Sequence, residues 1–171
     1  MYDKELNEAL LFAAKFFIQS DQNPGKPAFL HSIRLSQLAQ KMGYDKTIIV
    51  SAALHDLIED TDCTLADIQE MWGERISEIV QSLTVQTKGI SKLEAFEDSL
   101  LRSVRIGKES LIVRVLDVID NMNYYELASE EDKKYLQKKW KYLFATAQHE
   151  IANEKAFLCF QDKLQSLGCI A

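Results

Sequence analysis

The chain is almost free of the residues that interrupt helices. Its 171 residues include 6 glycines and 2 prolines, and both prolines lie in the short segment Asn23–Pro27. Elsewhere, apolar residues recur at helical spacing, as in Leu6, Leu10, Ala13 and Phe17. This spacing is typical of helices that bury one face against a core. The sequence therefore predicts an all-α helical bundle.

Polar residues that can cap a helix recur between the apolar segments, and they predict where helices begin. Two of them have an acidic residue three positions later, which is the spacing of a capping box. Residues 107–125 are so apolar that we expect a central helix there, and residues 129–168 predict two more. We find no linker, repeat or low-complexity tract, so residues 1–171 are expected to form one domain. The predicted caps are Asp45, Thr64 with Asp67, and Ser91 with Glu94.

Composition narrows the class of protein. The chain is 47% hydrophobic and 27% charged, as in ordinary folded domains, and its formal net charge of −6 argues against a nucleic-acid partner. Its apolar stretches are shorter than the roughly 20 residues of a membrane span, and its polar start predicts no signal peptide. Three cysteines without a CxxC pair fit a reducing compartment. We expect a cytoplasmic protein without a membrane partner, and a homodimer stays open.

The most informative segment is His55-Asp56-Leu57-Ile58-Glu59-Asp60-Thr61-Asp62, which we expect to close an apolar helix that begins near Thr47. On an ideal helix, His55, Asp56, Glu59 and Asp60 project within about 140° of one another. Carboxylates this close repel unless a cation compensates them. The segment therefore predicts a divalent metal site, and the alternative is a solvated acidic helix end.

His31 and Asp117, which lie far from this segment in the sequence, would complete this site. Asp117 lies in an apolar run, and a buried carboxylate requires a partner or a metal. Arg114, one turn earlier, is an alternative partner, unless it faces a ligand phosphate. If His31, His55, Asp56 and Asp117 converge, two imidazoles and two carboxylates form a shell suited to Mn²⁺, Fe²⁺ or Zn²⁺.

Such a site favours hydrolysis of a phosphate ester. A bound cation lowers the pKa of water and neutralises a phosphoryl oxygen. Glu59 or Asp60 would then orient or deprotonate the water. Lys26, Arg34 or Arg114 would offset phosphate charge. The residues thus predict a metal-dependent phosphohydrolase that acts on a small nucleotide.

Three ordered motifs, within about residues 22–125, carry a family resemblance. The segments are Gly25–His31, His55–Thr61 and Asp117–Met122, and they resemble G-x-P-Y-[IL]-x-H, H-D-x-x-E-D-T and D-x-x-x-N-[ML]. These motifs are similar to those of the HD-domain metal-dependent phosphohydrolases. The likeness is to the hydrolase domain of the RelA/SpoT stringent-response enzymes and to stand-alone alarmone hydrolases.

The resemblance implies an HD-type helical bundle that removes pyrophosphate from the 3′ position of guanosine alarmones, with (p)ppGpp as the first substrate to test. It also implies Mn²⁺ as the metal and roles for particular residues. These are His31, His55, Asp56 and Asp117 as metal ligands, Glu59 and Asp60 beside the attacking water, and Lys88 and Asn121 in the substrate pocket.

The chain also differs from this family. Gln22-Asn23 stands where the stringent-response hydrolases carry an Arg-Lys pair that helps to hold the base, and Val118 and Asp120 replace an arginine and a histidine. A related nucleotide is therefore an alternative substrate. Two other functions stay open: a nucleotide-binding regulatory module without turnover, and an HD-type 5′-nucleotidase.

Overall fold

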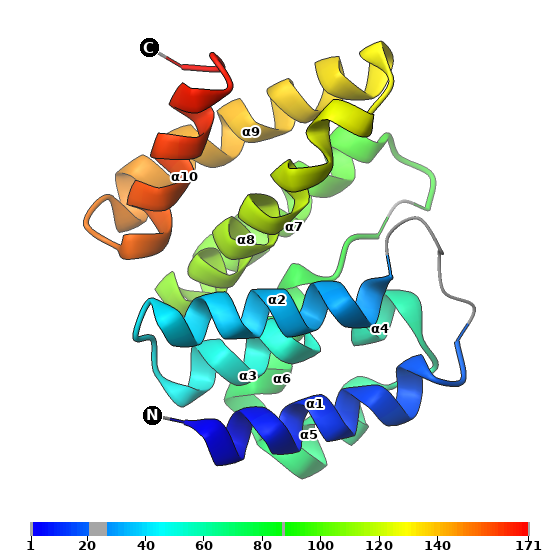
Figure 1. Cartoon of the computed structure of the whole chain (residues 1–171). Coiled ribbons are helices and arrows are strands. Elements are labelled where there is room, and N and C mark those ends of the chain that lie inside the picture. Colours follow the sequence, from blue (N-terminus) through cyan, green and yellow to red (C-terminus); the bar gives the residue numbers. More distant parts are fainter. Residues whose placement is uncertain (1, 21–26, 87, 171) are drawn as a thin grey trace.

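The computed structural model describes residues 2–20, 27–86 and 88–170, and helices joined by short turns make up these ranges (Figure 1). The prediction of an all-α fold is confirmed. In chain order the helices are α1 (Asp3–Phe17), α2 (Ala28–Lys41), α3 (Lys46–Leu54), α4 (Leu57–Asp60), α5 (Leu65–Trp72), α6 (Glu74–Leu83), α7 (Lys92–Ile106), α8 (Lys108–Asn121), the 3-10 helix η1 (Met122–Leu127), α9 (Glu130–Ile151) and α10 (Lys155–Ser166).

Helix α8 forms the centre of the bundle, as its apolar sequence predicts. It runs between the group of α1, α2 and α3 and the pair of α9 and α10 (Figure 1), and it contacts α2, α3, α6, α7, α9 and α10. All of its residues from Ser110 to Asp120 are buried. Any polar side chain in that run must therefore find its partners inside the bundle.

The predicted caps are confirmed. Asp45 accepts a hydrogen bond from the Ile48 N–H at 3.1 Å, and complete capping boxes begin α5 at Thr64 and α7 at Ser91. These local bonds satisfy N–H groups that the first turn of a helix leaves unpaired.

The prediction of one continuous helix through His55 and Asp60 is wrong. Helix α3 ends at Leu54, and α4 begins at Leu57. The break lies at His55 and Asp56, where the Asp56 backbone has φ −93° and ψ −2°. On an unbroken helix these two neighbours would point about 100° apart, whereas the break lets both side chains reach the same point.

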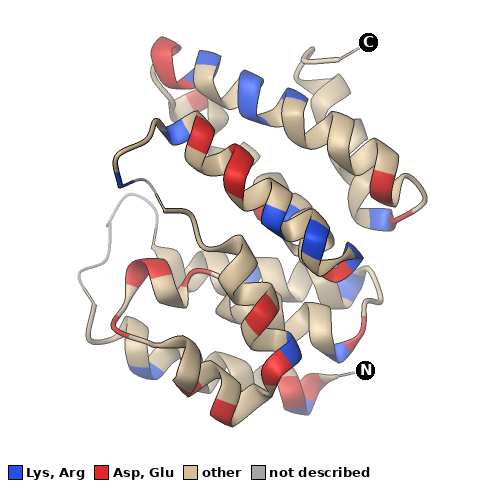
Figure 2. Cartoon of the chain, turned by 180° about the vertical axis from the view of Figure 1, so that it is seen from behind, with Lys and Arg blue, Asp and Glu red and all other residues tan. Residues whose placement is uncertain are grey.

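The C-terminal helices pack on α8 through large aromatic side chains. Trp140 of α9 and Phe157 and Phe160 of α10 are at most 3% exposed, and they belong to one buried cluster with residues of α2, α3 and α8. None of the described helices is both long enough and apolar enough to cross a membrane. On the face shown in Figure 2, acidic and basic residues share the same helices, α9 included.

Candidate metal centre

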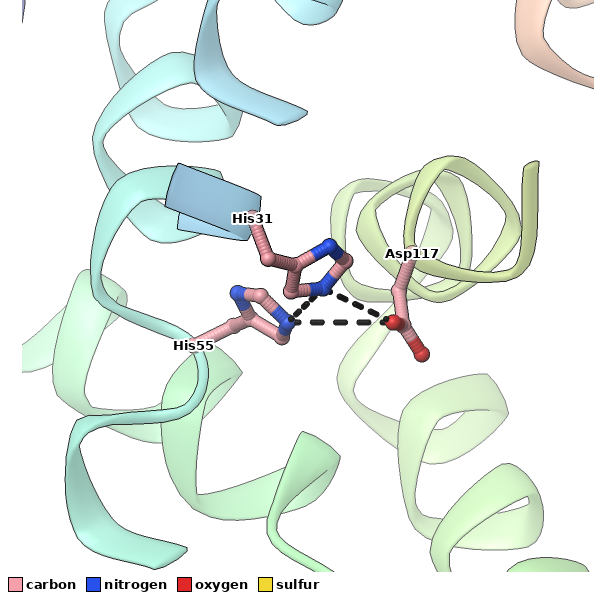
Figure 3. Close-up of side chains that lie close together, drawn as sticks. All are labelled: His31, His55 and Asp117. Atoms are coloured by element: carbon pink, nitrogen blue, oxygen red, sulfur yellow. Dashed lines mark hydrogen bonds and ion pairs between the residues drawn. The ribbon is translucent and has the colours of Figure 1, made fainter. Parts of the chain in front are cut away.

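Three predicted ligands from different elements meet inside the bundle (Figure 3). His31 projects from α2, His55 follows α3, and Asp117 projects from α8. His31 Nε2 lies 3.3 Å from His55 Nε2 and 3.2 Å from Asp117 Oδ1, and His55 Nε2 lies 3.9 Å from that oxygen. All three residues are buried, and one ligand atom of each lies within 4.8 Å of the others. The geometry suits a single metal ion.

Asp56, the fourth predicted ligand, lies at the more exposed side of this cluster. Its Oδ1 is 2.9 Å from His55 Nε2, and its Oδ2 is 3.7 Å from His31 Nε2. The Asp56 side chain is 23% exposed, compared with 0% for His31. A molecule from solvent would therefore approach the cluster beside Asp56.

Hydrogen bonds fix which nitrogen of each imidazole faces the cluster. His31 Nδ1 lies 2.7 Å from Asp120 Oδ2, and His55 Nδ1 lies 3.0 Å from the Ala52 carbonyl oxygen. Both partners accept hydrogen bonds, so each Nδ1 carries a proton and donates it. Each Nε2 is then left to face Asp117. Two imidazole nitrogens beside carboxylate oxygens are a donor set that fits a divalent transition-metal ion.

Electrostatics also favour positive charge at this point. Burial lowers the pKa of His31, but hydrogen bonds with Asp117 and Asp120 outweigh burial and raise this pKa to about 9. Burial raises the pKa of Asp117, but its hydrogen bond with His31 and the charge of Lys139 hold that pKa well below its usual range. A divalent cation would supply the positive charge in place of protons, so metal binding is expected to release protons.

Asp120, which is not among the predicted site residues, supports the cluster from the far side of His31. It is 5% exposed, and it accepts from Arg34 Nε at 2.9 Å and Nη2 at 2.8 Å as well as from His31. The Arg34 Nη2 also donates to Tyr124 Oη at 3.0 Å. Arg34, expected to offset phosphate charge, thus uses two of its nitrogens to hold Asp120. The available signal was that Asp120 lies three residues after Asp117 in the same buried run.

Asp120→Asn is expected to weaken divalent-metal binding by about 10- to 100-fold, the usual cost of losing a partner behind a metal ligand. The asparagine keeps the size of the side chain but loses the charge that orients His31. Competition with a metal-binding dye would measure the affinity, with Asp162→Asn on the exposed surface of α10 as control. Unchanged affinity in Asp120→Asn would show that His31 does not need this partner.

Glu59 and Asp60 lie on the short helix α4. Glu59 Oε1 accepts a hydrogen bond from the Val85 N–H at 2.6 Å. The pKa of Glu59 is raised to about 7, because loss of water around the carboxyl group and the charge of Asp56 outweigh the Val85 bond. The Glu59 residue as a whole is exposed, while its carboxyl group lies against the backbone at Val85. A carboxylate with this pKa is suited to accept a proton near neutral pH.

Asn121 lies beside the metal cluster, whereas Arg114 donates hydrogen bonds at the end of α6. Asn121 Nδ2 donates to Asp117 Oδ1, which places this predicted substrate residue beside a predicted ligand. Arg114 is 3% exposed, and its Nη2 donates to the Leu83 carbonyl and to Ser99 Oγ. These two bonds hold Nη2 inside the bundle, and burial lowers the pKa of Arg114 while the charge of Asp117 partly offsets this. Contact of Arg114 with a substrate phosphate stays a prediction.

The remaining predicted substrate residues are less defined. Lys88 is exposed in the turn between α6 and α7. Lys26 lies outside the described residues, as does Gln22-Asn23. For Lys26 and Lys88, contact with substrate stays a prediction.

A cavity of about 330 Å³ adjoins Asn121 between η1 and α9. Lys139 lines it, and the charge of this lysine also lowers the pKa of Asp117. The sequence gives no signal that separates Lys139 from the four other lysines of α9. The other lining residues include Tyr124, Asp132, Tyr135 and Trp140.

Comparisons with known proteins agree with this fold. The sequence model of the HD domain matches residues 9–150. The chain is 27% identical over 150 residues to the guanosine-3′,5′-bis(diphosphate) 3′-pyrophosphohydrolase of Aquifex aeolicus, covering 86% of this chain and 22% of that protein. It is 28% identical over 151 residues to a probable enzyme of the same name from Mycoplasma pneumoniae, covering 82% and 21%. The chain therefore spans about a fifth of the length of these relatives.

A solved structure matches the whole fold. It is described as a metazoan ortholog of SpoT that hydrolyzes ppGpp and plays a role in starvation responses, and the match has a TM-score of 0.81. The alignment covers 99% of both chains at 20% sequence identity. At this identity the likeness establishes the helical fold.

Proposed function

This chain belongs to the HD domain family, and on that premise we propose that it is a metal-dependent phosphohydrolase that removes pyrophosphate from the 3′ position of a (p)ppGpp-like guanosine alarmone. The observation that carries the proposal is the convergence of His31, His55 and Asp117, three residues from distant parts of the chain, on one point. The names of the relatives support the choice of substrate.

We propose that His31, His55, Asp56 and Asp117 hold Mn²⁺. When bound, the ion supplies a Lewis acid for a phosphoryl oxygen and lowers the pKa of water. The chain itself holds both imidazoles in the required tautomer, through Asp120 and the Ala52 carbonyl. These bonds prepare the ligands before substrate arrives.

Glu59 is proposed as the general base. The Val85 N–H holds one carboxylate oxygen, which leaves the second oxygen to accept a proton from the attacking water. Asp60 is proposed to orient the same water, since it follows Glu59 directly on the same short helix. The proton thus passes to a residue just outside the proposed metal ligands.

The cavity beside Asn121 is proposed to receive part of the nucleotide. Tyr124 and Tyr135 offer aromatic surface to a base, and Lys139 offers positive charge to a phosphate. Asn121 joins the cavity to the metal site, because it lines the cavity and also donates to Asp117. Lys26, Lys88 and the remaining nitrogen of Arg34 are proposed as further phosphate contacts.

A nucleotide panel with Mn²⁺ tests the function. We expect pyrophosphate release from (p)ppGpp, with the guanosine 5′-phosphates left intact, and loss of this activity in a chelator. Phosphate release from 5′-mononucleotides would instead favour the 5′-nucleotidase. Binding without product over many enzyme equivalents would favour the regulatory module. The cytoplasmic location and the homodimer stay predictions from the sequence.

A further inference from the structure

The backbone at the end of α6 is tied to the proposed general base. Helix α6 ends at Leu83, and two residues later the Val85 N–H donates to Glu59 Oε1 at 2.6 Å. Glu59 lies on α4, a helix of 4 residues. A single helical turn has little stability of its own. The position of the Glu59 carboxylate therefore depends on what holds Val85.

Arg102 of α7 holds this backbone through a two-pronged contact. Its Nη1 donates to the Gln81 carbonyl and its Nη2 to the Thr84 carbonyl, both at 2.8 Å. Asp98 in turn fixes the guanidinium, accepting from Arg102 Nε at 3.0 Å. A planar guanidinium that holds two carbonyls restricts both the place and the direction of the peptide that follows, and the next N–H is that of Val85.

Arg114 holds the same segment from inside the bundle. Its Nη2 donates to the Leu83 carbonyl, which Arg102 does not contact, and to Ser99 Oγ. Its Nε is buried without a hydrogen-bond partner among the described residues. Burying such a charge is costly, and an apolar side chain of similar size is often more stable. The carbonyl contact offers a reason for a charge at this position.

We propose that Arg102 is a positioning residue for Glu59. Arg102 acts through the Thr84 carbonyl and the Val85 N–H, and Arg114 assists it. The inference rests on the proposed function for its catalytic consequence. A plainer explanation is that the arginines only cap the C-terminus of α6, whose last carbonyls lack partners within the helix. The two explanations differ in what happens to Glu59 when Arg102 is removed.

The first experiment measures position without substrate. In ¹⁵N-labelled protein, we expect the Val85 amide of Arg102→Ala to exchange with solvent at least about 10-fold faster than in the unmodified chain, because the peptide is no longer held. Arg102→Lys keeps a charge but cannot hold both carbonyls as a fork, so intermediate exchange is expected.

Arg75 provides a matched control. Its Nη2 donates to the Ile106 carbonyl at the end of α7 and to Glu109 at 2.9 Å. Arg75 therefore also holds the end of a helix, but these bonds do not involve residues 81–85 or Glu59. Arg75→Ala should leave Val85 exchange unchanged. Equal Val85 exchange in Arg102→Ala and the unmodified chain would overturn the inference, whatever the substrate is.

The second experiment is a double-mutant cycle on turnover. Arg102→Ala should lower kcat by about 10- to 100-fold, as expected when a catalytic group moves by about 1 Å, with KM and Mn²⁺ affinity unchanged. In a Glu59→Gln background the same substitution should cost almost nothing, because there is no base left to position. An equal loss in both backgrounds would mean that Arg102 acts by another route and would overturn the inference.

Failure of the proposed function has a different result. It would show as no turnover of any nucleotide by the unmodified protein, and Val85 exchange would then still decide whether Arg102 maintains the hydrogen bond between Val85 and Glu59.

Discussion

Asp117→Asn is expected to lower kcat/KM for the alarmone by at least about 1,000-fold and to abolish tight Mn²⁺ binding. Losing a partner behind a metal ligand costs about 10- to 100-fold, and a direct ligand should exceed this. Asp117 Oδ1 lies within 3.9 Å of Nε2 of both histidines. An amide at that position removes the negative charge that a cation between the imidazoles requires. Metal analysis of the purified variant and pyrophosphate release measure the two effects.

Asp162→Asn is the matched control, because it makes the same change on an exposed part of α10 and should leave both measurements unaltered. The Asp117 variant should keep its helical circular dichroism, since the side chain retains its size. Asp56→Ala is also expected to lower both turnover and Mn²⁺ binding. Full Mn²⁺-dependent turnover in the Asp117 variant would remove the metal-centre proposal.

The features that depend on local sequence were predictable. Thr64 and Ser91 begin helices because the capping partner lies three residues away in the chain. Similarly, the apolar run around Asp117 predicts the buried central helix α8, and burial makes this carboxylate a candidate ligand. The site was therefore predictable to the extent that its members stand out from their own neighbours.

The break between α3 and α4 was not predictable from periodicity. The apolar spacing of the preceding residues continues a helix, whereas His55 Nδ1 turns back to the Ala52 carbonyl and Asp56 leaves the helical path. Helix α3 packs against α1, α2 and α8, and such contacts between distant segments are contained in no local pattern. His55 and Asp56 therefore come together at a break in the helix and not on one face of an ideal helix.

Partnerships between distant residues were equally hidden. Arg34 and Asp120 lie 86 positions apart, and Glu59 and Val85 lie 26 apart. Arg34 was expected to contact phosphate, because a basic residue near a phosphate site suggests that role. The structure shows a carboxylate already holding two of its nitrogens, so only the fold distinguishes a residue that contacts substrate from one that supports a ligand.

Glu59→Gln is expected to reduce kcat by about 100- to 10,000-fold, the range for loss of a general base, while Mn²⁺ binding stays within about 2-fold. The glutamine can still accept the Val85 hydrogen bond, so the loop should keep its position and the loss should come from proton transfer. Glu70→Gln, an exposed substitution on α5, is the matched control. Comparable loss of metal would instead indicate that Glu59 helps to hold the ion.

The pH dependence provides an independent check on this base. Glu59 works when deprotonated, so kcat should rise with pH through its pKa and then level off. That pKa is raised to about 7 by the surroundings of the carboxyl group, and a nearby bound cation favours the charged form, so the midpoint should lie at or below 7. In Glu59→Gln this rise should disappear from the residual activity. If the same rise persisted, another group would be accepting the proton, and Asp60 on the same helix would be the next residue to replace.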